Sequence, residues 1–251
     1  MRTRLLLVAL VAPALLALAS PAAAQWHRQR HHRVHQKAPH FYIGGAFAVE
    51  QPTGELADFL DQGYGLDVNL LYRPTPRSPI SLRVDGGYVQ YGSERRPVGF
   101  GPGIGDRIHL DLVTNNYIAF AGIGPQLAAT GGAVLPYVNA NVGLAYFGTS
   151  SELEGYGSES FATTENYSDA NFAYGAGAGL YIPVSRGRTP VSIDLGVRYH
   201  HNGRVSYLRE GSIEDFPDGS IAIHPITSDA NFYTFQFGVS VGMRSSRERR
   251  R

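Results

Sequence analysis

Cysteine is absent from the 251-residue sequence, and lysine occurs only once, at position 37. A chain without cysteine forms no disulfide bonds, so an exported domain built from it needs another constraint, such as a closed barrel. Long apolar runs are also missing after the first 24 residues. A membrane-spanning helix needs about 20 consecutive apolar residues, so this absence argues against a helical inner-membrane protein.

The central part of the chain has an unusual charge. Residues 41–243 contain 11 arginines, no lysine and 20 aspartates and glutamates, which gives a net charge of −9. Lysine is a standard residue on the exposed strands and edges of soluble β-proteins. A wall of strands that faces lipid rather than water explains why it is missing here. The two ends are basic: residues 25–40 have four basic residues and no acid, and the tail 244–251 has five arginines and one glutamate.

Residues 1–24 have the composition of a secretory signal peptide. Arg2 and Arg4 supply a positive start, residues 5–19 form an apolar core, and residues 22–24 form a small-residue cleavage site. The alternative is a single membrane anchor, although the apolar run is shorter than a spanning helix requires. The mature chain of about 225 residues fits a single β-domain.

Residues 25–40 contain five of the nine histidines and have no apolar periodicity. We interpret this His/Arg-rich segment as flexible, because it has too few apolar side chains to form a core. His31 and His35 would share one face of a helix and could bind a metal ion there. A solvated basic segment needs no such helix, so we predict no metal site and no cofactor.

Residues 231–242 alternate between two faces. Tyr, Phe and Val occupy the odd positions from 233 to 241, and mostly small or polar residues occupy the even ones. Successive strand residues point to opposite sides of a sheet, so this stretch is predicted to be a strand with one apolar face. Seven earlier segments alternate in the same way. The eight predicted strands are residues 41–50, 63–73, 80–91, 107–127, 134–147, 170–182, 191–201 and 231–242.

The connections between these strands alternate strictly between short and long. This pattern is typical of an up-and-down barrel with turns at one membrane face and loops at the other, and an even strand number puts both termini on the turn side. The barrel is expected to span residues 41–243 and to close between its last strand and its first. The short connections are residues 74–79, 128–133 and 183–190, and the long ones are 51–62, 92–106, 148–169 and 202–230.

Two local irregularities are expected. The alternation changes phase near Asn115 and Asn116, which predicts a β-bulge. The last long loop contains Pro-Asp-Gly-Ser at residues 217–220, a strong turn signal flanked by β-favouring residues. We predict that the last two strands continue beyond the membrane as a hairpin capped at Asp218 and Gly219.

Alternation alone does not say which face is inside, because a soluble lipocalin-like barrel would have the two faces exchanged. The polar face consists mainly of Gly, Ala, Ser and Asn, which suits a narrow interior, and aromatic residues cluster near strand ends, as in membrane girdles. We therefore predict an all-β fold, an eight-stranded antiparallel up-and-down transmembrane β-barrel with a filled interior. Charges held inside need partners. The predicted interior charged network is Asp67, Arg73, Arg83, Asp85, Asp194 and Arg198.

The signal peptide, the eight alternating strands, the short and long connections and the aromatic final strand resemble the small outer-membrane β-barrels of the OmpA/OmpX type. The resemblance implies location in the outer membrane, contact with lipid and lipopolysaccharide, and insertion by the barrel assembly machinery. It also implies roles in envelope integrity, adhesion or slow solute passage. The sequence departs from the family where the tail 244–251 follows the final strand, so Phe235 and Phe237 would have to replace the usual terminal aromatic residue.

One stretch suggests an enzyme. Lipid A deacylases resemble this chain in being eight-stranded barrels with a His and a nearby Ser at the outer leaflet, where the His activates the Ser. Here the candidates are His200, His201 and Ser206, and the Ser expected two positions after the His is missing. The simpler interpretation is that both histidines end a strand near the outer interface.

We therefore expect a non-enzymatic, porin-like outer-membrane protein with a structural, surface-binding or narrow solute-passage role. The alternatives are a lipid A-modifying hydrolase and a soluble barrel. A surface ligand would bind through the long loops 51–62, 92–106, 148–169 and 202–230. No partner is expected among nucleic acids, because the basic residues lie in terminal segments without interleaved aromatics.

Overall fold

The computed structural model describes residues 39–99, 109–155, 160–186, 189–216 and 220–243. The predicted signal peptide, nearly all of the His/Arg-rich segment and the basic tail lie outside these ranges. So do Asp218 and Gly219, the predicted cap of the last hairpin. Among the described residues, no helix is long and apolar enough to cross a membrane.

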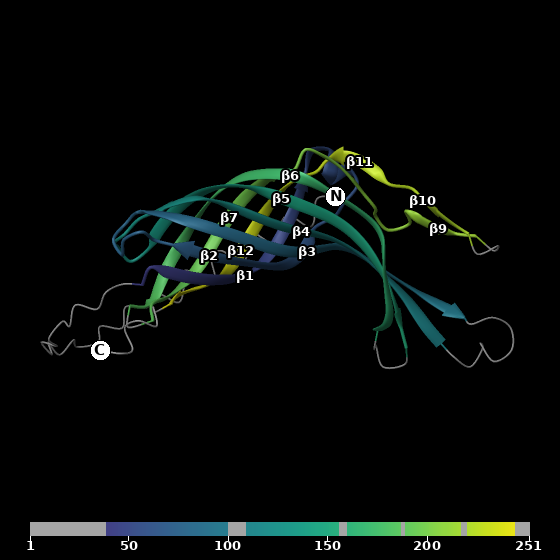
Figure 1. Cartoon of the computed structure of the whole chain (residues 1–251), viewed down its shortest axis with the longest axis horizontal. Helices are drawn as coiled ribbons and strands as arrows, with labels where there is room; N and C mark the ends of the chain where they lie inside the picture. The colour runs from purple at the N-terminus through teal and green to yellow at the C-terminus, as the bar shows by residue number, and fades with distance from the viewer. Residues whose placement is uncertain (1–38, 100–108, 156–159, 187–188, 217–219, 244–251) are drawn as a thin grey trace, which may run out of the picture. The chain divides into compact units, whose positions relative to one another are not determined.

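The described chain consists almost entirely of β-strands, with one short 3₁₀-helix, η1 (Gly54–Asp58), after the first strand (Figure 1). Eight strands form a closed antiparallel ring in the order β1-β2-β3-β4-β5-β6-β7-β12. The four remaining strands lie in the connection between β7 and β12. The strands are β1 (Phe41–Thr53), β2 (Gly63–Tyr72), β3 (Ile80–Gly99), β4 (His109–Ala128), β5 (Leu135–Glu154), β6 (Ser160–Ser185), β7 (Val191–His201), β8 (Arg204–Tyr207), β9 (Ile213–Asp215), β10 (Ile221–Ile223), β11 (Ile226–Asp229) and β12 (Asn231–Met243).

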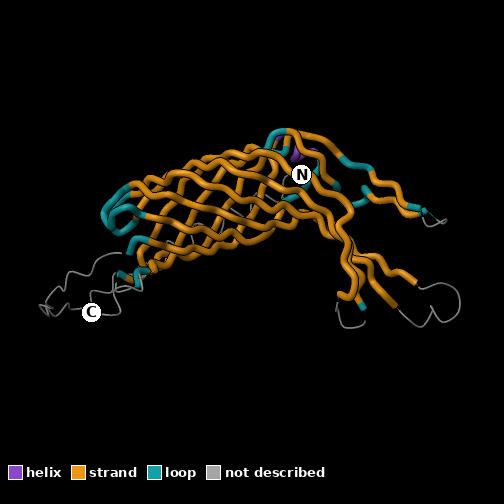
Figure 2. Tube along the Cα trace, in the orientation of Figure 1, coloured by secondary structure: helices purple, strands orange, loops and turns teal. Residues whose placement is uncertain are grey.

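The ring closes where the sequence predicted it would. β12 pairs with β1 along its whole length, from Met243 opposite Phe41 to Asn231 opposite Thr53. Every other pair in the ring joins consecutive ring strands, with β8–β11 as an excursion between β7 and β12, so the topology is up-and-down (Figure 2). The predicted fold, an eight-stranded antiparallel barrel, is confirmed.

The prediction of long loops at residues 92–106 and 148–169 is wrong for most of the residues that the structure describes there, because they belong to strands. Residues 92–99 extend β3 and residues 148–154 extend β5, while β6 already begins at Ser160. The four strands β3–β6 thus continue past the ring as a sheet of their own (Figures 1 and 2). The sequence signal fails here because, once a strand leaves the lipid, neither of its faces has to be apolar.

The predicted bulge and hairpin both have counterparts in the structure. The register between β3 and β4 shifts between Gln90 and Gly92, opposite Asn116, so the irregularity lies on β3 and not on β4. In the last connection, β8 pairs with β11 and β9 pairs with β10, which forms the extended hairpin. Phe216 N donates to Ser220 O at 2.9 Å and holds the two sides together next to the tip.

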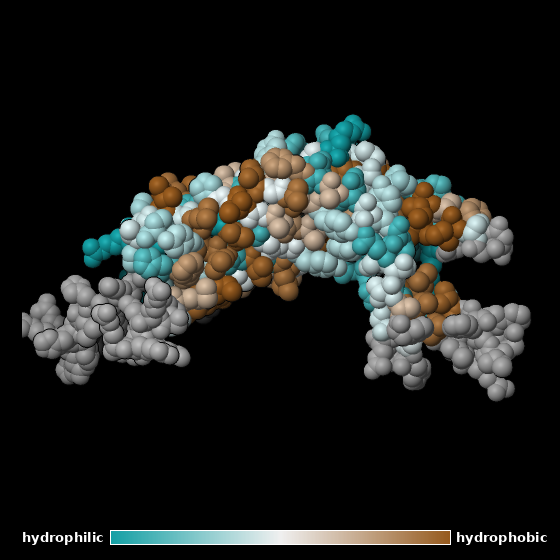
Figure 3. Space-filling model, in the orientation of Figure 1, coloured by the Kyte–Doolittle hydropathy of each residue, from teal (hydrophilic) through white to brown (hydrophobic). Residues whose placement is uncertain are grey.

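The outer wall of the ring is apolar, as a lipid-facing surface must be. Leu66, Leu144 and Phe237 are 66, 61 and 62% exposed, and apolar side chains gather on the wall in the face shown in Figure 3. Aromatic rings on neighbouring strands contact one another near the loop end, which is typical of a membrane girdle. These contacts join Phe47 to Tyr64, Tyr88 to Tyr117, Tyr117 to Tyr146, Tyr174 to His201 and Tyr199 to Tyr233.

The interior is filled in two layers. Toward the turn end it is polar, and toward the loop end it is apolar. We call the apolar layer the outer plug. It combines inward side chains of the ring with residues of η1 and β8 that lie over the mouth, and it brings Phe147 within 6.0 Å of Tyr207 between ring centroids. The outer plug consists of Leu56, Leu60, Ile118, Phe120, Ala145, Phe147, Ala173, Val205, Tyr207, Ala230 and Phe232.

Candidate functional site

Five of the six predicted interior charges are buried in the polar layer. Asp85 lies at their centre, because its Oδ1 accepts from Arg83 Nε at 2.5 Å on β3 and from Arg198 Nη2 at 2.9 Å on β7. Arg198 Nη1 also lies 3.8 Å from Asp67 Oδ2. The side chains of these four residues are at most 3% exposed. The cluster therefore joins opposite parts of the wall through buried ion pairs.

Asp194 enters the network through a tyrosine. Tyr137 Oη donates to Asp194 Oδ1 at 2.8 Å and accepts from Gln236 Nε2 at 3.0 Å. Arg83 Nη1 donates to Gln126 Oε1 at 3.0 Å. The sequence prediction omitted Tyr137, Gln126 and Gln236. The alternation along each strand could have placed all three in the interior, because each lies an even number of positions from a polar inward residue on its own strand.

Glycines make room for these large polar side chains. Within residues 175–179 of β6, every side-chain position that faces the interior is a glycine. A Cβ atom at Gly177 would lie 3.0 Å from Asn139 Oδ1 and 3.1 Å from Arg198 Cβ. The interior at this level is thus filled from the neighbouring strands β5 and β7, while β6 contributes only backbone.

Arg73 lies apart from the other predicted charges, just beyond the turn end of β2. Its guanidinium carbon is 4.7 Å from the centroid of the Tyr42 ring, a cation–π contact. Its backbone N–H donates to His40 O at 2.7 Å. Arg73 takes part in none of the ion pairs formed by the described residues.

The structure does not assemble the candidate catalytic residues. His200 faces the interior, 3% exposed, with its ring centroid 4.9 Å from that of Phe120 and 4.7 Å from that of Phe232. His201 faces outward against Tyr174. Within the described part of the chain, Ser206 Oγ has its hydrogen bond with Thr227 Oγ1, at 2.8 Å, and none with either histidine. His200 and His201 are the last two residues of β7, as predicted, and the structure adds that aromatic rings enclose the His200 side chain.

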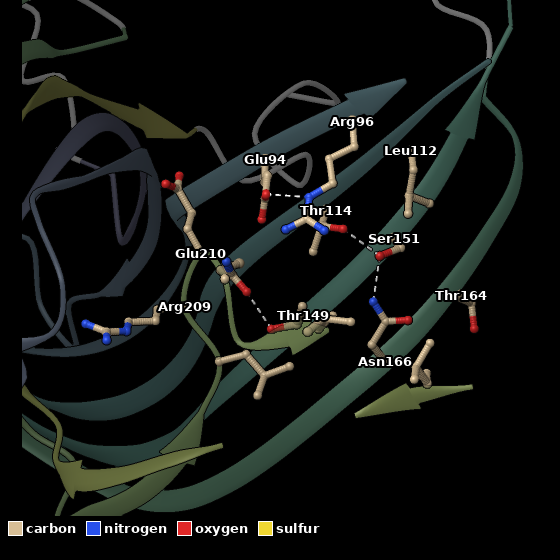
Figure 4. Close-up of a pocket in the computed structure, with 15 residues that line it drawn as sticks. Glu94, Arg96, Leu112, Thr114, Thr149, Ser151, Thr164, Asn166, Arg209 and Glu210 are labelled. Carbon is tan, nitrogen blue, oxygen red and sulfur yellow. Dashed lines mark hydrogen bonds and ion pairs between the residues drawn. The ribbon is translucent and has the colours of Figure 1, made fainter. Parts of the chain in front are cut away.

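A pocket of about 200 Å³ lies outside the ring, on the inner face of the sheet that β3–β6 form beyond the membrane (Figure 4). The connection after β8 and the hairpin β9–β10 form its other wall. No single stretch of sequence contains it, and so it was not predicted as a site. Its lining is Glu94, Arg96, Leu112, Thr114, Asn116, Thr149, Ser151, Thr164, Asn166, Leu208, Arg209, Glu210, Gly211, Ile213 and Ile221.

One wall of the pocket is a ladder of hydroxyl and amide groups. Ser151 Oγ lies 2.8 Å from Thr114 Oγ1 and accepts from Asn166 Nδ2 at 2.6 Å (Figure 4). Thr149 Oγ1 donates to Asn116 Oδ1 at 2.6 Å. These side chains share one face because their positions on β4 and β5 are directly opposed, Thr114 with Ser151 and Asn116 with Thr149. We call this surface the hydroxyl–amide wall.

The four charged residues of the pocket are already engaged within the protein. Arg96 Nε donates to Glu94 Oε1 at 2.6 Å, Glu210 Oε1 accepts from Ser93 N at 3.3 Å, and the Arg209 guanidinium lies 5.9 Å from the Phe59 ring centroid. They carry two charges of each sign, so the lining has no net charge.

The connection after β8 is fixed from beneath by two tyrosines, Tyr91, which is partly buried, and Tyr207, which is buried. Tyr91 Oη donates to Leu208 O at 3.0 Å, and Tyr91 packs edge-on against Tyr207 of the outer plug. The connection that bears Leu208 and Arg209 is thereby held over the sheet.

The described residues contain no group of three or more His, Asp or Glu side chains placed to hold a metal ion. His31 and His35, the pair considered from the sequence, lie outside the described ranges. The hydroxyl–amide wall and the mutually paired charges suit recognition of a polar ligand by hydrogen bonds rather than metal chemistry.

The model of the outer membrane protein beta-barrel domain family matches residues 10–242 of the chain. The chain belongs to this family. It is accordingly an outer-membrane protein that crosses the bilayer with β-strands. In such barrels the short turns face the periplasm and the long connections face the outside. The sheet extension and its pocket therefore lie on the extracellular side.

Several solved structures of small outer-membrane barrels are similar to this chain. Neisserial surface protein A is 17% identical with a TM-score of 0.46, and the match covers 82% of this chain and 99% of that one. OprG from Pseudomonas aeruginosa is 12% identical, covering 84% and 98%, with a TM-score of 0.44. Ail of Yersinia pestis, solved with the heparin analogue sucrose octasulfate, is 14% identical, covering 82% and 98%, with a TM-score of 0.36. No curated protein sequence matches the chain.

Proposed function

We propose that this outer-membrane barrel is a non-catalytic surface-binding protein whose binding site is the extracellular pocket. The observation that carries the proposal is the pocket itself, with a hydroxyl–amide wall that the three barrel strands β4, β5 and β6 build above the membrane. Strands position side chains more rigidly than loops do, which lowers the entropy cost of binding.

The filled interior supports binding rather than transport. A solute would have to pass the outer plug, where Phe147, Tyr207 and Phe232 are at most 1% exposed, and then the buried ion pairs around Asp85. We infer that the interior charges are structural and fasten opposite parts of the wall. The lipid-facing wall lies against outer-membrane lipid and lipopolysaccharide, and insertion by the barrel assembly machinery with Phe235 and Phe237 as its signal stays a prediction.

The catalytic alternative has little support in the geometry. A Ser hydrolase needs its His within hydrogen-bond reach of the Ser. His200 is enclosed between Phe120 and Phe232, and Ser206 is paired with Thr227. We therefore propose that the pattern around His200 is structural.

The sealed interior predicts that the wild-type protein forms no open ion-conducting path. In planar bilayers at neutral pH, its insertion is expected to add no steady current, because both the outer plug and the ion-pair layer block the lumen. A general porin inserted into the same bilayer is the positive control. Steady single-channel steps from the folded protein would instead favour solute passage and count against the proposal.

The binding role is tested by filling the pocket. Thr164 lines the pocket, and its neighbour Thr163 lies on the opposite face of β6. We expect Thr164→Trp to abolish binding of any pocket ligand and Thr163→Trp to leave it unchanged. The measurement is ligand-observed NMR on the full-length protein in lipid nanodiscs, with a panel of neutral sugars, amino acids, dipeptides and inorganic anions.

The two variants also control for folding, since each should keep the shifted mobility of a folded barrel on unheated gels. If the folded wild-type protein binds no member of the panel, the proposed function is wrong. If the Thr164→Trp variant binds the same ligands as tightly as the wild type does, the pocket is not the binding site and the proposed function is again wrong.

A further inference from the structure

We propose that the extracellular pocket binds an uncharged saccharide unit about the size of one pyranose ring. This inference rests on the proposed binding function of the same pocket and names its ligand. A pyranose ring presents hydroxyl groups around its edge and C–H groups on its faces. The pocket offers a matching pair of surfaces, one polar and one aliphatic.

The hydroxyl–amide wall matches the edge of such a ring. Each hydroxyl of Thr114, Ser151 or Thr164 both donates and accepts a hydrogen bond, and each amide of Asn116 or Asn166 offers two donors and an acceptor. A sugar hydroxyl is likewise a donor and an acceptor, so it can join such a ladder in either direction. The links of Ser151 to Thr114 and Asn166 hold the ladder in place before any ligand arrives.

The opposite side supplies the apolar contact. Leu208 lies on the connection after β8, and Ile213 and Ile221 lie on the β9–β10 hairpin, where β9 and β10 pair directly. Leu112 lies on β4 and borders the polar wall. A ring placed between the two walls directs its hydroxyls to β4–β6 and a C–H face to the aliphatic side chains, so both surfaces leave water together.

The charges argue against an ionic ligand. Glu94 and Arg96 pair with each other, and Glu210 accepts from a backbone N–H. A phosphate or sulfate at Arg96 would have to displace the Glu94 carboxylate, and a metal ion at Glu94 would have to displace the Arg96 guanidinium. The zero net charge of the lining gives neither ion a long-range attraction.

The size of the pocket limits the ligand to one ring. Its volume of about 200 Å³ lies below the roughly 300 Å³ at which pockets for drug-sized ligands begin. The pocket opens to the extracellular side, so a terminal or branch sugar of a longer glycan could enter while the rest of the glycan stays in solvent.

The test measures binding of methyl glycosides of glucose, galactose and mannose and of N-acetylglucosamine. The full-length protein in nanodiscs is examined by saturation-transfer NMR and titration. We expect at least one glycoside to bind, and Ser151→Ala to weaken it about fivefold, the loss that corresponds to about 1 kcal/mol for one hydrogen bond. Ser150→Ala is the matched control, because Ser150 lies next to Ser151 on β5 and faces the other side.

The outcomes separate this inference from the function on which it rests. Binding of a glycoside that Thr164→Trp removes and Thr163→Trp keeps supports both. Binding of phosphate or glycylglycine in place of the glycosides, with the same dependence on residue 164, overturns the saccharide assignment and leaves a surface-binding protein. Glycoside binding that survives Thr164→Trp overturns the site, and absence of binding by every probe overturns both. If Ser151→Ala does not fold, the tryptophan pair alone decides.

Discussion

Replacing Asp85 with alanine is expected to lower the free energy of unfolding of the barrel by about 3–5 kcal/mol, the usual cost of removing one partner from a buried ion pair. Asp85 Oδ1 is the common acceptor for Arg83 Nε and Arg198 Nη2. Without it, two guanidinium groups remain in the interior, and among the described residues only Asp67, 3.8 Å from Arg198, stays within ion-pair distance of either. The measurement is the fraction of protein that keeps folded mobility on unheated gels as urea increases.

Asp111→Ala is the matched control. Asp111 also pairs with an arginine, Arg95, at 2.9 Å, but the two side chains are 38 and 52% exposed. An exposed pair contributes only about 0–1 kcal/mol, so the urea midpoint should hardly change. Equal effects of the two substitutions would show that the interior pairs do not fasten the wall.

The same comparison separates a structural network from a gate. If the network only fills the barrel, the Asp85→Ala protein that remains folded should stay non-conducting, because the outer plug around Phe147 and Phe232 is untouched. Current that appears in this variant would assign the seal to the ion pairs and weaken the proposal that the plug closes the mouth.

The sequence predicted the ring well because lipid imposes a strict rule on one face of each strand. Within the bilayer every outward residue must be apolar, so a period of two appears in residues 231–242 and in the seven earlier segments. The rule ends at the aromatic contacts. Beyond them, β3 continues through Glu94 and Arg96, with water on both sides, and the alternation that identified strands disappears.

The interior was predicted only in part, because phase shows which face a residue occupies and not what it touches. Asp85 and Arg198 stand out as charges among Gly and Ser, and they do meet. Tyr137 has the same inward phase, but an aromatic residue near a strand end fits a girdle equally well. The surroundings of His200 were not predicted for a related reason, since the rings of Phe120 and Phe232 that enclose it come from strands β4 and β12.

The pocket could not be predicted from the sequence for a different reason. Its lining comes from β3, β4, β5, β6, the connection after β8 and the β9–β10 hairpin, and no one of these segments alone indicates a site. Its polar wall exists only because the register of β4 on β5 sets Thr114 opposite Ser151. Register depends on pairing across the whole sheet, which one polar segment does not reveal.

Replacing Gly196 with leucine is the second substitution with a large expected effect. A Cβ atom at this position would lie 2.6 Å from Tyr137 Oη and 2.7 Å from Gln236 Nε2. Both side chains are buried, Gln236 Nε2 donates a hydrogen bond to Tyr137 Oη, and Tyr137 Oη donates one to Asp194 Oδ1. A leucine must therefore displace Tyr137, which adds an overpacking cost of about 1–3 kcal/mol to about 1–3 kcal/mol for the donor that buried Asp194 loses. The free energy of unfolding should fall by roughly 2–6 kcal/mol.

Gly45→Leu makes the same chemical change at a glycine that has no neighbouring atom within 4 Å of its Cβ position and faces outward. Its effect on the urea midpoint is expected to stay within about 0.5 kcal/mol, because the added side chain enters lipid and not the packed interior. Equal tolerance of leucine at both positions would mean that the interior can accommodate extra volume. The room for Tyr137 would then not depend on glycine, and the filled, non-conducting interior on which the proposed function rests would lose its main support.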